Sequence, residues 1–96
     1  MAAYLIADIQ EITDTARYDE YRKHTPGAIA AYGGKFVVRG GKTKSLEGDW
    51  TQERFVVIEF PDMAAAERFY RSPEYQKILP LRLQASKGRA LLVEGV

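Results

Sequence analysis

Three charged residues stand in segments that are otherwise apolar, and they are the first candidates for chemistry. They are Asp8, Arg39 and Glu59. Two carboxylates close together raise the pKa of one of them, whereas a nearby arginine lowers it. Such a group can act as a general acid or base, or can anchor a polar ligand. We therefore take Asp8 and Glu59 as candidate catalytic residues and all three as candidate ligand contacts. A purely structural ion-pair cluster is the alternative.

Trp50, Tyr75 and Arg82 are further candidates for the border of a pocket. Trp50 is the only tryptophan and falls in an expected loop, where it can cover a pocket or pack on a partner. Tyr75 and Arg82 fall on one expected helix, and their alternatives are core packing and surface ion pairing. His24 is the only histidine. Its neighbours are polar, so we expect a solvated surface position rather than a catalytic one.

The composition excludes several other classes of site. The chain has no cysteine, which removes disulfides, thiolate zinc sites and cysteine nucleophiles. With a single histidine besides, we expect no metal site, and we expect no cofactor. The 14 basic and 13 acidic residues nearly balance, so we expect neither a nucleic-acid partner nor a membrane partner. No apolar run approaches the roughly 20 residues of a membrane span, and no signal peptide is evident, which favours a cytoplasmic protein.

The elements that must position these residues can be read from periodicity and turn signals. The 96 residues suffice for a single domain covering the whole chain. Apolar runs rich in β-branched residues predict four strands, at residues 4–11, 35–43, 54–60 and 89–94. Residues 45–50 form the loop between the second and third strands. The second and third strands are thereby joined into a long hairpin.

Helical spacing and capping signals predict the helices between these strands. A helix is expected over residues 14–32, kinked or split by Pro26 and stopped by Gly33. A second helical region follows Asp62. It makes a fresh start at Ser72, with a proline at the first helical position, and ends near Ala85.

The order β-α-β-β-α-β predicts an α+β, ferredoxin-like fold. In this fold a four-stranded antiparallel sheet has the strand order 4-1-3-2 and carries both helices on one face. We expect strands one and three to be parallel neighbours, which would place Asp8 and Glu59 near the same end. A regular hairpin would put Arg39 opposite Val57 and diagonal to Glu59.

Side chains that alternate along the strands form two sets, and both sets are largely apolar. We expect the first set to face the helices; it comprises Leu5, Ala7, Ile9, Phe36, Val38, Val56, Ile58, Phe60, Leu91 and Val93. The second set, on the uncovered face, comprises Tyr4, Ile6, Asp8, Val37, Arg39, Phe55, Val57, Glu59, Ala90, Leu92 and Glu94. An exposed apolar face of this size favours a homodimer in which two sheets pack together.

The chain also resembles a known family of small bacterial proteins, the domain of unknown function 1330. The segments that carry the resemblance are Ala31-Tyr32-Gly33-Gly34-Lys35-Phe36, Arg39-Gly40-Gly41, Leu46-Glu47-Gly48, Glu59-Phe60-Pro61, Phe69 to Gln76 and Val93-Glu94-Gly95. They span nearly the whole chain. The family usually has tryptophan where Phe69 stands and arginine where Lys35 stands, so both are conservative departures.

This resemblance implies a dimeric α+β barrel and no established activity. The wider superfamily includes cofactor-free monooxygenases, haem-degrading enzymes and lactone isomerases, and fold alone does not choose among them. The chain has no asparagine. The tryptophan–histidine–asparagine set of the haem-degrading relatives therefore cannot be assembled, which argues against an oxygenase and leaves an isomerase untouched.

Three hypotheses for the function follow. The first is a homodimer that binds a small organic molecule in each barrel, with or without turnover. The second is a cofactor-free isomerase or monooxygenase with Asp8 or Glu59 as the base. The third is a structural dimer that binds no ligand.

Overall fold

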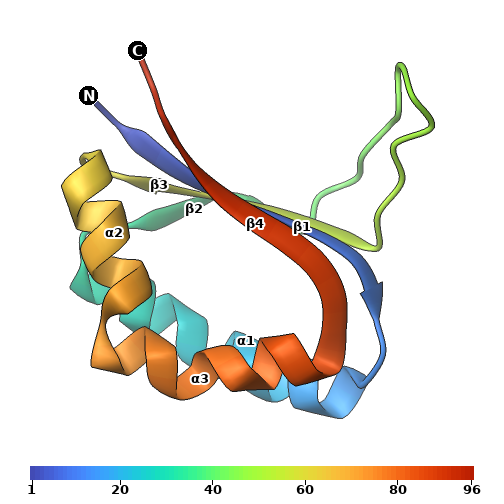
Figure 1. Cartoon of the computed structure of the whole chain (residues 1–96), viewed down its shortest axis with the longest axis horizontal. Helices are drawn as coiled ribbons and strands as arrows, with labels where there is room; N and C mark the ends of the chain where they lie inside the picture. Colours follow the sequence, from blue (N-terminus) through green and yellow to red (C-terminus); the bar gives the residue numbers. More distant parts are fainter.

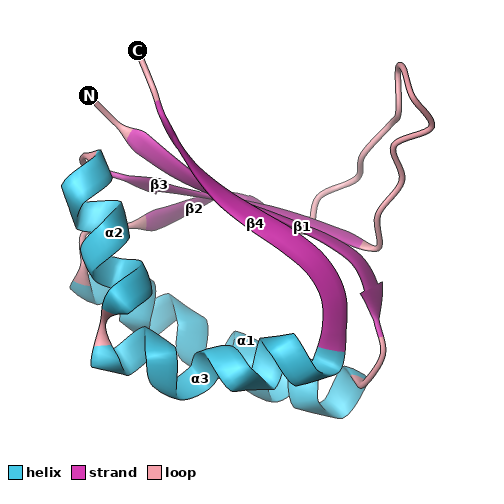
Figure 2. Ribbon diagram, in the orientation of Figure 1, coloured by secondary structure: helices cyan, strands magenta, loops and turns pink.

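Four strands and three helices follow one another in the order β-α-β-β-α-α-β. The computed structural model describes all residues 1–96. The elements are β1 (Ala3–Ile12), α1 (Thr15–Ala31), β2 (Lys35–Arg39), β3 (Arg54–Phe60), α2 (Met63–Arg71), α3 (Pro73–Ala85) and β4 (Ser86–Glu94). The strands form one antiparallel sheet in the order β2-β3-β1-β4, and the helices lie together on one side of it (Figures 1 and 2). The predicted ferredoxin-like fold and strand order are confirmed.

Helix α1 runs through Pro26 without a break. Its amino end is capped by Asp14, whose side chain accepts a hydrogen bond from the backbone N–H of Arg17 at 3.1 Å. A proline leaves the carbonyl four residues earlier without its usual donor. Here the Thr25 hydroxyl donates to the Arg22 carbonyl at 3.3 Å, which replaces that bond and explains why the helix does not split. Gly33, with φ of +77°, ends the helix as predicted.

The two shorter helices begin at the predicted caps. The Asp62 carboxylate accepts a hydrogen bond from the Ala65 N–H at 2.7 Å at the start of α2. Ser72 ends α2 and starts α3: its hydroxyl donates to the Phe69 carbonyl at 2.6 Å and accepts from the Tyr75 N–H at 3.1 Å. One short side chain thus fixes the bend between the two helices, which places Tyr75 over the sheet.

The hydrophobic core lies between the sheet and the helices. Phe60 and Phe69 are almost fully buried, and their ring centroids are 5.1 Å apart. Phe69 also packs on Tyr75 at 4.5 Å. Burying a large apolar side chain contributes about 1.5–3 kcal/mol to the free energy of unfolding. These contacts therefore anchor α2 and α3 to β3.

The other side of the sheet, which we call the open face, carries no helix. Its side chains come from all four strands: Tyr4, Ile6 and Asp8 of β1, Lys35 and Val38 of β2, Phe55, Val57 and Glu59 of β3, and Arg89, Leu91 and Val93 of β4. The predicted faces were therefore wrong for Val38 of β2 and for Ala90, Leu91, Leu92, Val93 and Glu94 of β4. In the β1–β4 register Leu92 lies opposite the buried Leu5, so Leu91 and Val93 point to the open face.

Two irregular segments shape the edges of the sheet. The register between β1 and β4 shifts between Ile9 and Glu11, and both strands curl down towards the helices there (Figure 1). Strand β2 ends at Arg39 rather than at the predicted Thr43, and β4 begins at Ser86, directly after α3.

Residues 40–53 form a loop that projects on the side away from the helices (Figure 1). No helix combines the length and apolarity that a bilayer crossing would need.

Candidate ligand-binding site

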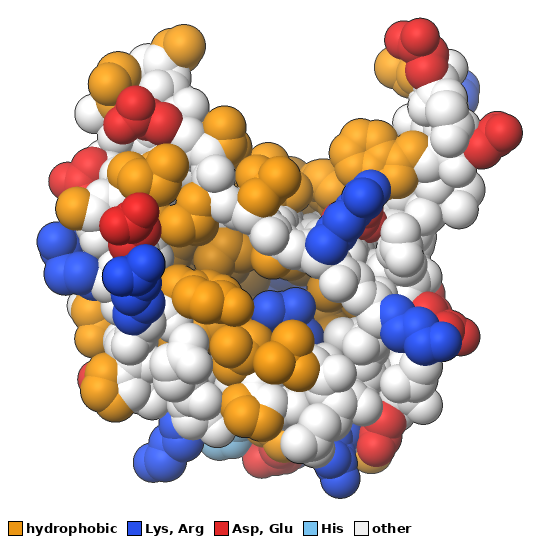
Figure 3. Space-filling model, viewed as in Figure 1, with side chains coloured by type: hydrophobic (Ala, Val, Ile, Leu, Met, Phe, Trp, Pro, Cys, Tyr) orange, Lys and Arg blue, Asp and Glu red, His pale blue; other side chains and the backbone are white.

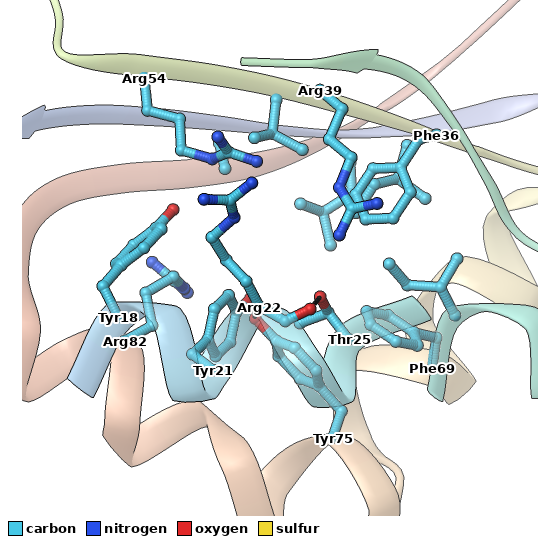
Figure 4. A pocket seen from close by; sticks show the side chains of 15 residues that line it. Tyr18, Tyr21, Arg22, Thr25, Phe36, Arg39, Arg54, Phe69, Tyr75 and Arg82 are labelled. Carbon is cyan, nitrogen blue, oxygen red and sulfur yellow. Dashed lines mark hydrogen bonds between the residues drawn. The ribbon is translucent and has the colours of Figure 1, made fainter. Parts of the chain in front are cut away.

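A pocket, here called the inner pocket, lies between the helix-covered side of the sheet and helices α1 and α3. Its lining comprises Leu5, Ala7, Tyr18, Tyr21, Arg22, Thr25, Ile29, Phe36, Arg39, Arg54, Val56, Ile58, Phe69, Tyr75 and Arg82 (Figure 4). The centre of a water molecule can reach a volume of about 30 Å³ inside it. One water requires roughly 10–15 Å³ of such volume, so the pocket admits a small polar group. Figure 3 shows a hollow between the sheet and the helices, with apolar walls and arginine or lysine atoms at its floor.

Four arginines reach this pocket, each from a different element. Arg22 comes from α1, Arg39 from β2, Arg54 from β3 and Arg82 from α3. Figure 4 shows Arg54 and Arg39 descending from the sheet towards Arg22, which rises from the helix below. No aspartate or glutamate is among the lining residues. The pocket is therefore a site of concentrated positive charge.

A β-bulge places Arg39 in the inner pocket. In the β2–β3 register Phe36 lies opposite Ile58 and Val38 opposite Val57, so Val37 is an extra residue. The extra residue reverses the alternation that follows it. Arg39 consequently lies opposite Val56 on the helix side, with its guanidinium carbon 4.3 Å from the Phe36 ring centroid. The predictions that Arg39 lies opposite Val57 and on the uncovered face were wrong.

Gly40 leaves room for the guanidinium of Arg54. Gly40 has φ of +71°, a conformation that favours glycine, and a Cβ there would lie 2.5 Å from Nη1 of Arg54. Burial lowers the pKa of Arg54, and the like charges of Arg22 and Arg39 lower it further. Three guanidiniums thus repel one another at one side of the pocket, although Tyr18 counteracts part of this effect.

Arg82 is the most deeply buried of the four arginines. It is 6% exposed, and its Nε has no hydrogen-bond partner in the chain. Burial opposes its charge, but the oxygens of Tyr75 and Tyr21 outweigh burial and the pKa of Arg82 is raised. Arg82 was predicted as a pocket residue, with a surface ion pair as the alternative. It forms no ion pair and lines the inner pocket.

Three tyrosines supply neutral hydrogen-bonding groups to the same pocket. The hydroxyl oxygens of Tyr21 and Tyr75 are 2.7 Å apart, and either can be the donor. Burial raises the pKa of Tyr21 well above its ordinary value, with the neighbouring Tyr75 adding to the effect. Burial also raises the pKa of Tyr18, although Arg54 opposes it. The phenols of Tyr18 and Tyr21 therefore stay protonated near neutral pH and can donate hydrogen bonds.

Asp8 lies on the opposite side of the sheet, on the open face. It is 4% exposed, and its Oδ2 accepts hydrogen bonds from the indole N–H of Trp50 at 3.2 Å and from Arg89 Nε at 3.3 Å. The other carboxylate oxygen of Asp8 has no partner in the chain. Trp50 also packs edge-on against Phe55, with ring centroids 5.7 Å apart. These residues line a shallow pocket on the open face.

Glu59 lies at the other end of the same strands. Strand β1 runs antiparallel to β3, which pairs Tyr4 with Glu59 and Asp8 with Phe55. Glu59 accepts a hydrogen bond from the Tyr4 hydroxyl at 3.3 Å and has Lys35 Nζ at 3.4 Å. The predicted parallel pairing of strands one and three was wrong, and the structure does not bring Asp8, Arg39 and Glu59 together. Of the predicted site residues, only Arg39, Tyr75 and Arg82 line the inner pocket.

Several lining residues were not singled out from the sequence. Tyr18, Tyr21, Arg22 and Thr25 share one face of α1, at the spacing of successive helical turns. The signal in the sequence that could identify Arg22 as part of this face is its position one helical turn after Tyr18. His24 is half-exposed and contacts Glu20 at 3.1 Å, on the predicted solvated face. No three acidic or histidine side chains come together as a metal-binding cluster.

Solved structures with a similar fold include one protein with a described activity. A protein of unknown function from Rhodopseudomonas palustris superposes with a TM-score of 0.79 at 19% identity, over 99% of this chain and 82% of that one. A dimeric ferredoxin-like protein of unknown function from Jannaschia sp. gives 0.71 at 12%, over 99% and 100%. SnoaB, a cofactor-independent oxygenase from Streptomyces nogalater, gives 0.65 at 16%, over 99% and 93%. At these identities the likeness concerns the fold.

Comparison of the amino-acid sequence identifies a family for the chain, whereas the similar structures show only its fold. No curated protein matches it. The profile of one family, described as a domain of unknown function, matches residues 2–96 and so spans both faces of the sheet and the whole inner pocket. The chain belongs to this family, domain of unknown function 1330.

Proposed function

We propose that the protein is a homodimer that binds a small organic molecule in the inner pocket of each protomer. The observation that carries this proposal is Arg82, a buried cation that lines the pocket and whose Nε has no hydrogen-bond partner in the chain. Ligand sites typically combine an apolar lining with a few convergent polar groups. The inner pocket has this composition, because Phe36, Phe69 and the aliphatic side chains of the sheet surround the arginines and tyrosines.

The open face supports the dimer. Leu91 is 57% exposed and lies opposite the half-buried Ile6, which in turn lies opposite Val57; Val93 is 42% exposed and lies opposite Tyr4. A contiguous apolar surface of this kind marks an interaction site. Two copies related by a twofold axis would cover it with the same surface. Structural neighbours described as dimeric ferredoxin-like proteins favour the same assembly.

An enzymatic role is the second candidate, and the Streptomyces oxygenase with the same fold favours it. The inner pocket holds no carboxylate, so Asp8 and Glu59 cannot act as a base within it. Proton transfer there would fall to the tyrosines. Asp8 and Trp50 instead line the shallow pocket on the open face, which offers an alternative position for the ligand.

Ligand-observed and amide-detected NMR can test the proposal and locate the ligand. Wild-type protein would be titrated with a panel of small aromatic and aliphatic compounds, both charged and neutral. Binding in the inner pocket should shift the amide signals of Tyr18, Thr25 and Val56. A larger side chain in Val56→Phe should fill the pocket and weaken binding about tenfold or more, since even one excess methylene strains a packed site.

Val57→Phe is the matched control, because Val57 lies next to Val56 but points to the open face. It should leave binding within about twofold of wild type. Binding abolished by Val57→Phe and not by Val56→Phe would place the ligand on the open face and contradict the proposal. A panel in which no compound binds would favour the structural dimer without a ligand.

A further inference from the structure

The charge of the inner pocket is out of proportion to the rest of the chain. The chain carries 14 arginines and lysines and 13 aspartates and glutamates, for a net charge of +1. The pocket lining includes 4 arginines and no aspartate or glutamate. Of the ten arginines and lysines outside the pocket, five form an ion pair with a carboxylate, for example Lys35 with Glu59 and Arg89 with Asp8. The pocket therefore concentrates positive charge within a nearly neutral protein.

The arginines of the pocket lack carboxylate partners. Arg39, Arg54 and Arg82 form no ion pair with any carboxylate of the chain. Arg22 has one, with Asp19 at 3.7 Å, on the outer surface of α1. Guanidinium groups do not lose their proton in proteins, so their repulsion cannot be relieved by deprotonation. An anion placed among them would relieve it.

The neighbouring groups match the two ends of an organic acid. Guanidinium N–H groups and tyrosine hydroxyls are donors that suit a carboxylate. In the Tyr21–Tyr75 contact one hydroxyl hydrogen lies between the two oxygens, which leaves the other free to donate. Phe36, Phe69 and Ile58 form an apolar wall beside these donors. Inorganic phosphate or sulfate would make no use of that wall.

We infer that the ligand of the inner pocket is a small organic acid, whose carboxylate contacts the arginines and whose apolar part packs on Phe36 and Phe69. This inference rests on the proposed function and specifies the chemical class of its ligand. The free space of about 30 Å³ suits a carboxylate. A ring or chain attached to it would need Arg39, which is exposed and stacked on Phe36, to swing outwards.

Benzoate and benzamide are a matched pair of probes for this inference, because they share a ring and differ in charge. Isothermal titration and amide shifts would be recorded for both, and for acetate and phosphate. Benzoate should bind in the inner pocket at least about tenfold more tightly than benzamide, because hydrogen bonds to charged groups are the stronger ones. Acetate should bind more weakly than benzoate, since it lacks the apolar part.

Two arginine variants and one control variant complete the test. Arg54→Gln and Arg39→Gln should each weaken benzoate binding about tenfold and leave benzamide binding unchanged. Both arginines are partly or largely exposed, so their loss should not prevent folding. Arg68→Gln removes the same charge from the exposed surface of α2, outside the pocket. It should change benzoate binding less than twofold.

The outcomes separate this inference from the proposed function. Equal binding of benzoate and benzamide in the inner pocket would overturn the organic acid and leave the proposed function standing. Phosphate that binds as tightly as benzoate and competes with it would show a site for inorganic anions, which also overturns the inference. If neither these probes nor any compound of the wider panel shifts the amide signals of the inner pocket, the proposed function itself fails.

Discussion

At the scale of single residues, Arg82 separates the inner pocket from an ordinary core. Its side chain is buried and forms no ion pair with a carboxylate. The oxygens of Tyr75 and Tyr21 outweigh burial and raise the pKa of Arg82, so the guanidinium stays charged. Its Nε nevertheless has no hydrogen-bond partner in the chain. A buried donor of a charged group is costly to leave unpaired, and an anionic group bound in the pocket would be a suitable acceptor.

A second residue contact, between Tyr32 and Glu74, gives a prediction about pH. The Tyr32 hydroxyl donates to Glu74 Oε2 at 2.7 Å and ties the end of α1 to the first turn of α3. This hydrogen bond lowers the pKa of Glu74 below the ordinary 4.5, and a backbone N–H adds to it. Because the folded pKa is the lower one, the stabilisation is present above pH 4.5 and is lost as pH falls through the folded pKa.

Tyr32→Phe should therefore raise the pKa of Glu74 towards 4.5 and reduce the loss of stability in acid. The pKa can be followed by NMR titration of the Glu74 carboxyl group, and stability by melting curves from pH 3 to 7. The melting temperature of the variant near neutral pH should be only slightly lower than that of wild type, because both side chains are at the surface. A Glu74 pKa that is the same in the variant and in wild type would show that the hydrogen bond does not form in solution.

At the scale of elements, Trp50 connects the projecting part of the loop of residues 40–53 to the sheet. Trp50 donates to Asp8 and packs on Phe55, and its own backbone N–H donates to the Ser45 hydroxyl at 3.0 Å. Gly40 and Glu53, at the two ends of the loop, are hydrogen-bonded to the strands, and residues 41–49 are exposed. Trp50 is thus the point at which the loop is tied to the open face.

Asp8→Ala should release this attachment. Loss of the acceptor leaves the indole N–H of Trp50 without a partner, so the ring should become more exposed to solvent. Trp50 is the only tryptophan, and its emission should shift to longer wavelength and be quenched more readily by acrylamide. Glu59→Ala is the control, because Glu59 lies at the far end of β3, and it should leave the emission unchanged. Identical spectra for wild type and Asp8→Ala would show that Phe55 alone holds the ring.

Local signals predicted the elements well, whereas pairing between strands was predicted poorly. The caps at Asp14, Asp62 and Ser72 act within three residues, so the sequence reveals them directly. The direction of β3 relative to β1 follows from topology: a helical crossover makes β1 and β2 parallel, and the hairpin return then makes β3 antiparallel to both. With β3 antiparallel to β1, Asp8 and Glu59 lie at opposite ends of the paired strands.

The bulge at Val37 could not be predicted in the same way. Val37 and Val38 are both β-branched, and no glycine or proline marks the extra residue. The register of β4 was equally ambiguous, because both of its alternating sets contain leucine. For such strands the faces are decided by contacts with residues distant in sequence. The inner pocket depends on the bulge in β2, because the bulge brings Arg39 into the pocket.

At the scale of the whole molecule, the two sides of the sheet differ in what covers them. One is covered by the helices and contains the inner pocket. The other is a saddle with apolar side chains, flanked by the chain termini and by the loop of residues 40–53 (Figure 3). A second copy placed in this saddle would contact both flanks. The dimer interface and the proposed ligand site would then lie on opposite sides of the same β-strands.

Two exposed leucines allow a controlled test of the dimer. Leu91 is 57% exposed on the open face, and Leu83 is 61% exposed on α3. Because both are exposed in the isolated chain, a charge at either position should leave the protomer folded. In a twofold dimer Leu91→Glu removes two buried leucines, each of which contributes about 1.5–3 kcal/mol, and buries two charges. Leu83→Glu adds the same charge outside the interface.

Sedimentation velocity at micromolar concentration should therefore show wild type and Leu83→Glu as dimers and Leu91→Glu as a folded monomer. Circular dichroism confirms folding in each case. Because the inner pocket lies within one protomer, the Leu91→Glu monomer should still bind a ligand that wild type binds, within a few-fold in affinity. A dimeric Leu91→Glu, or a wild type that is monomeric at this concentration, would mean that the open face is not the interface. Loss of ligand binding in the folded monomer would instead show that the partner completes the site.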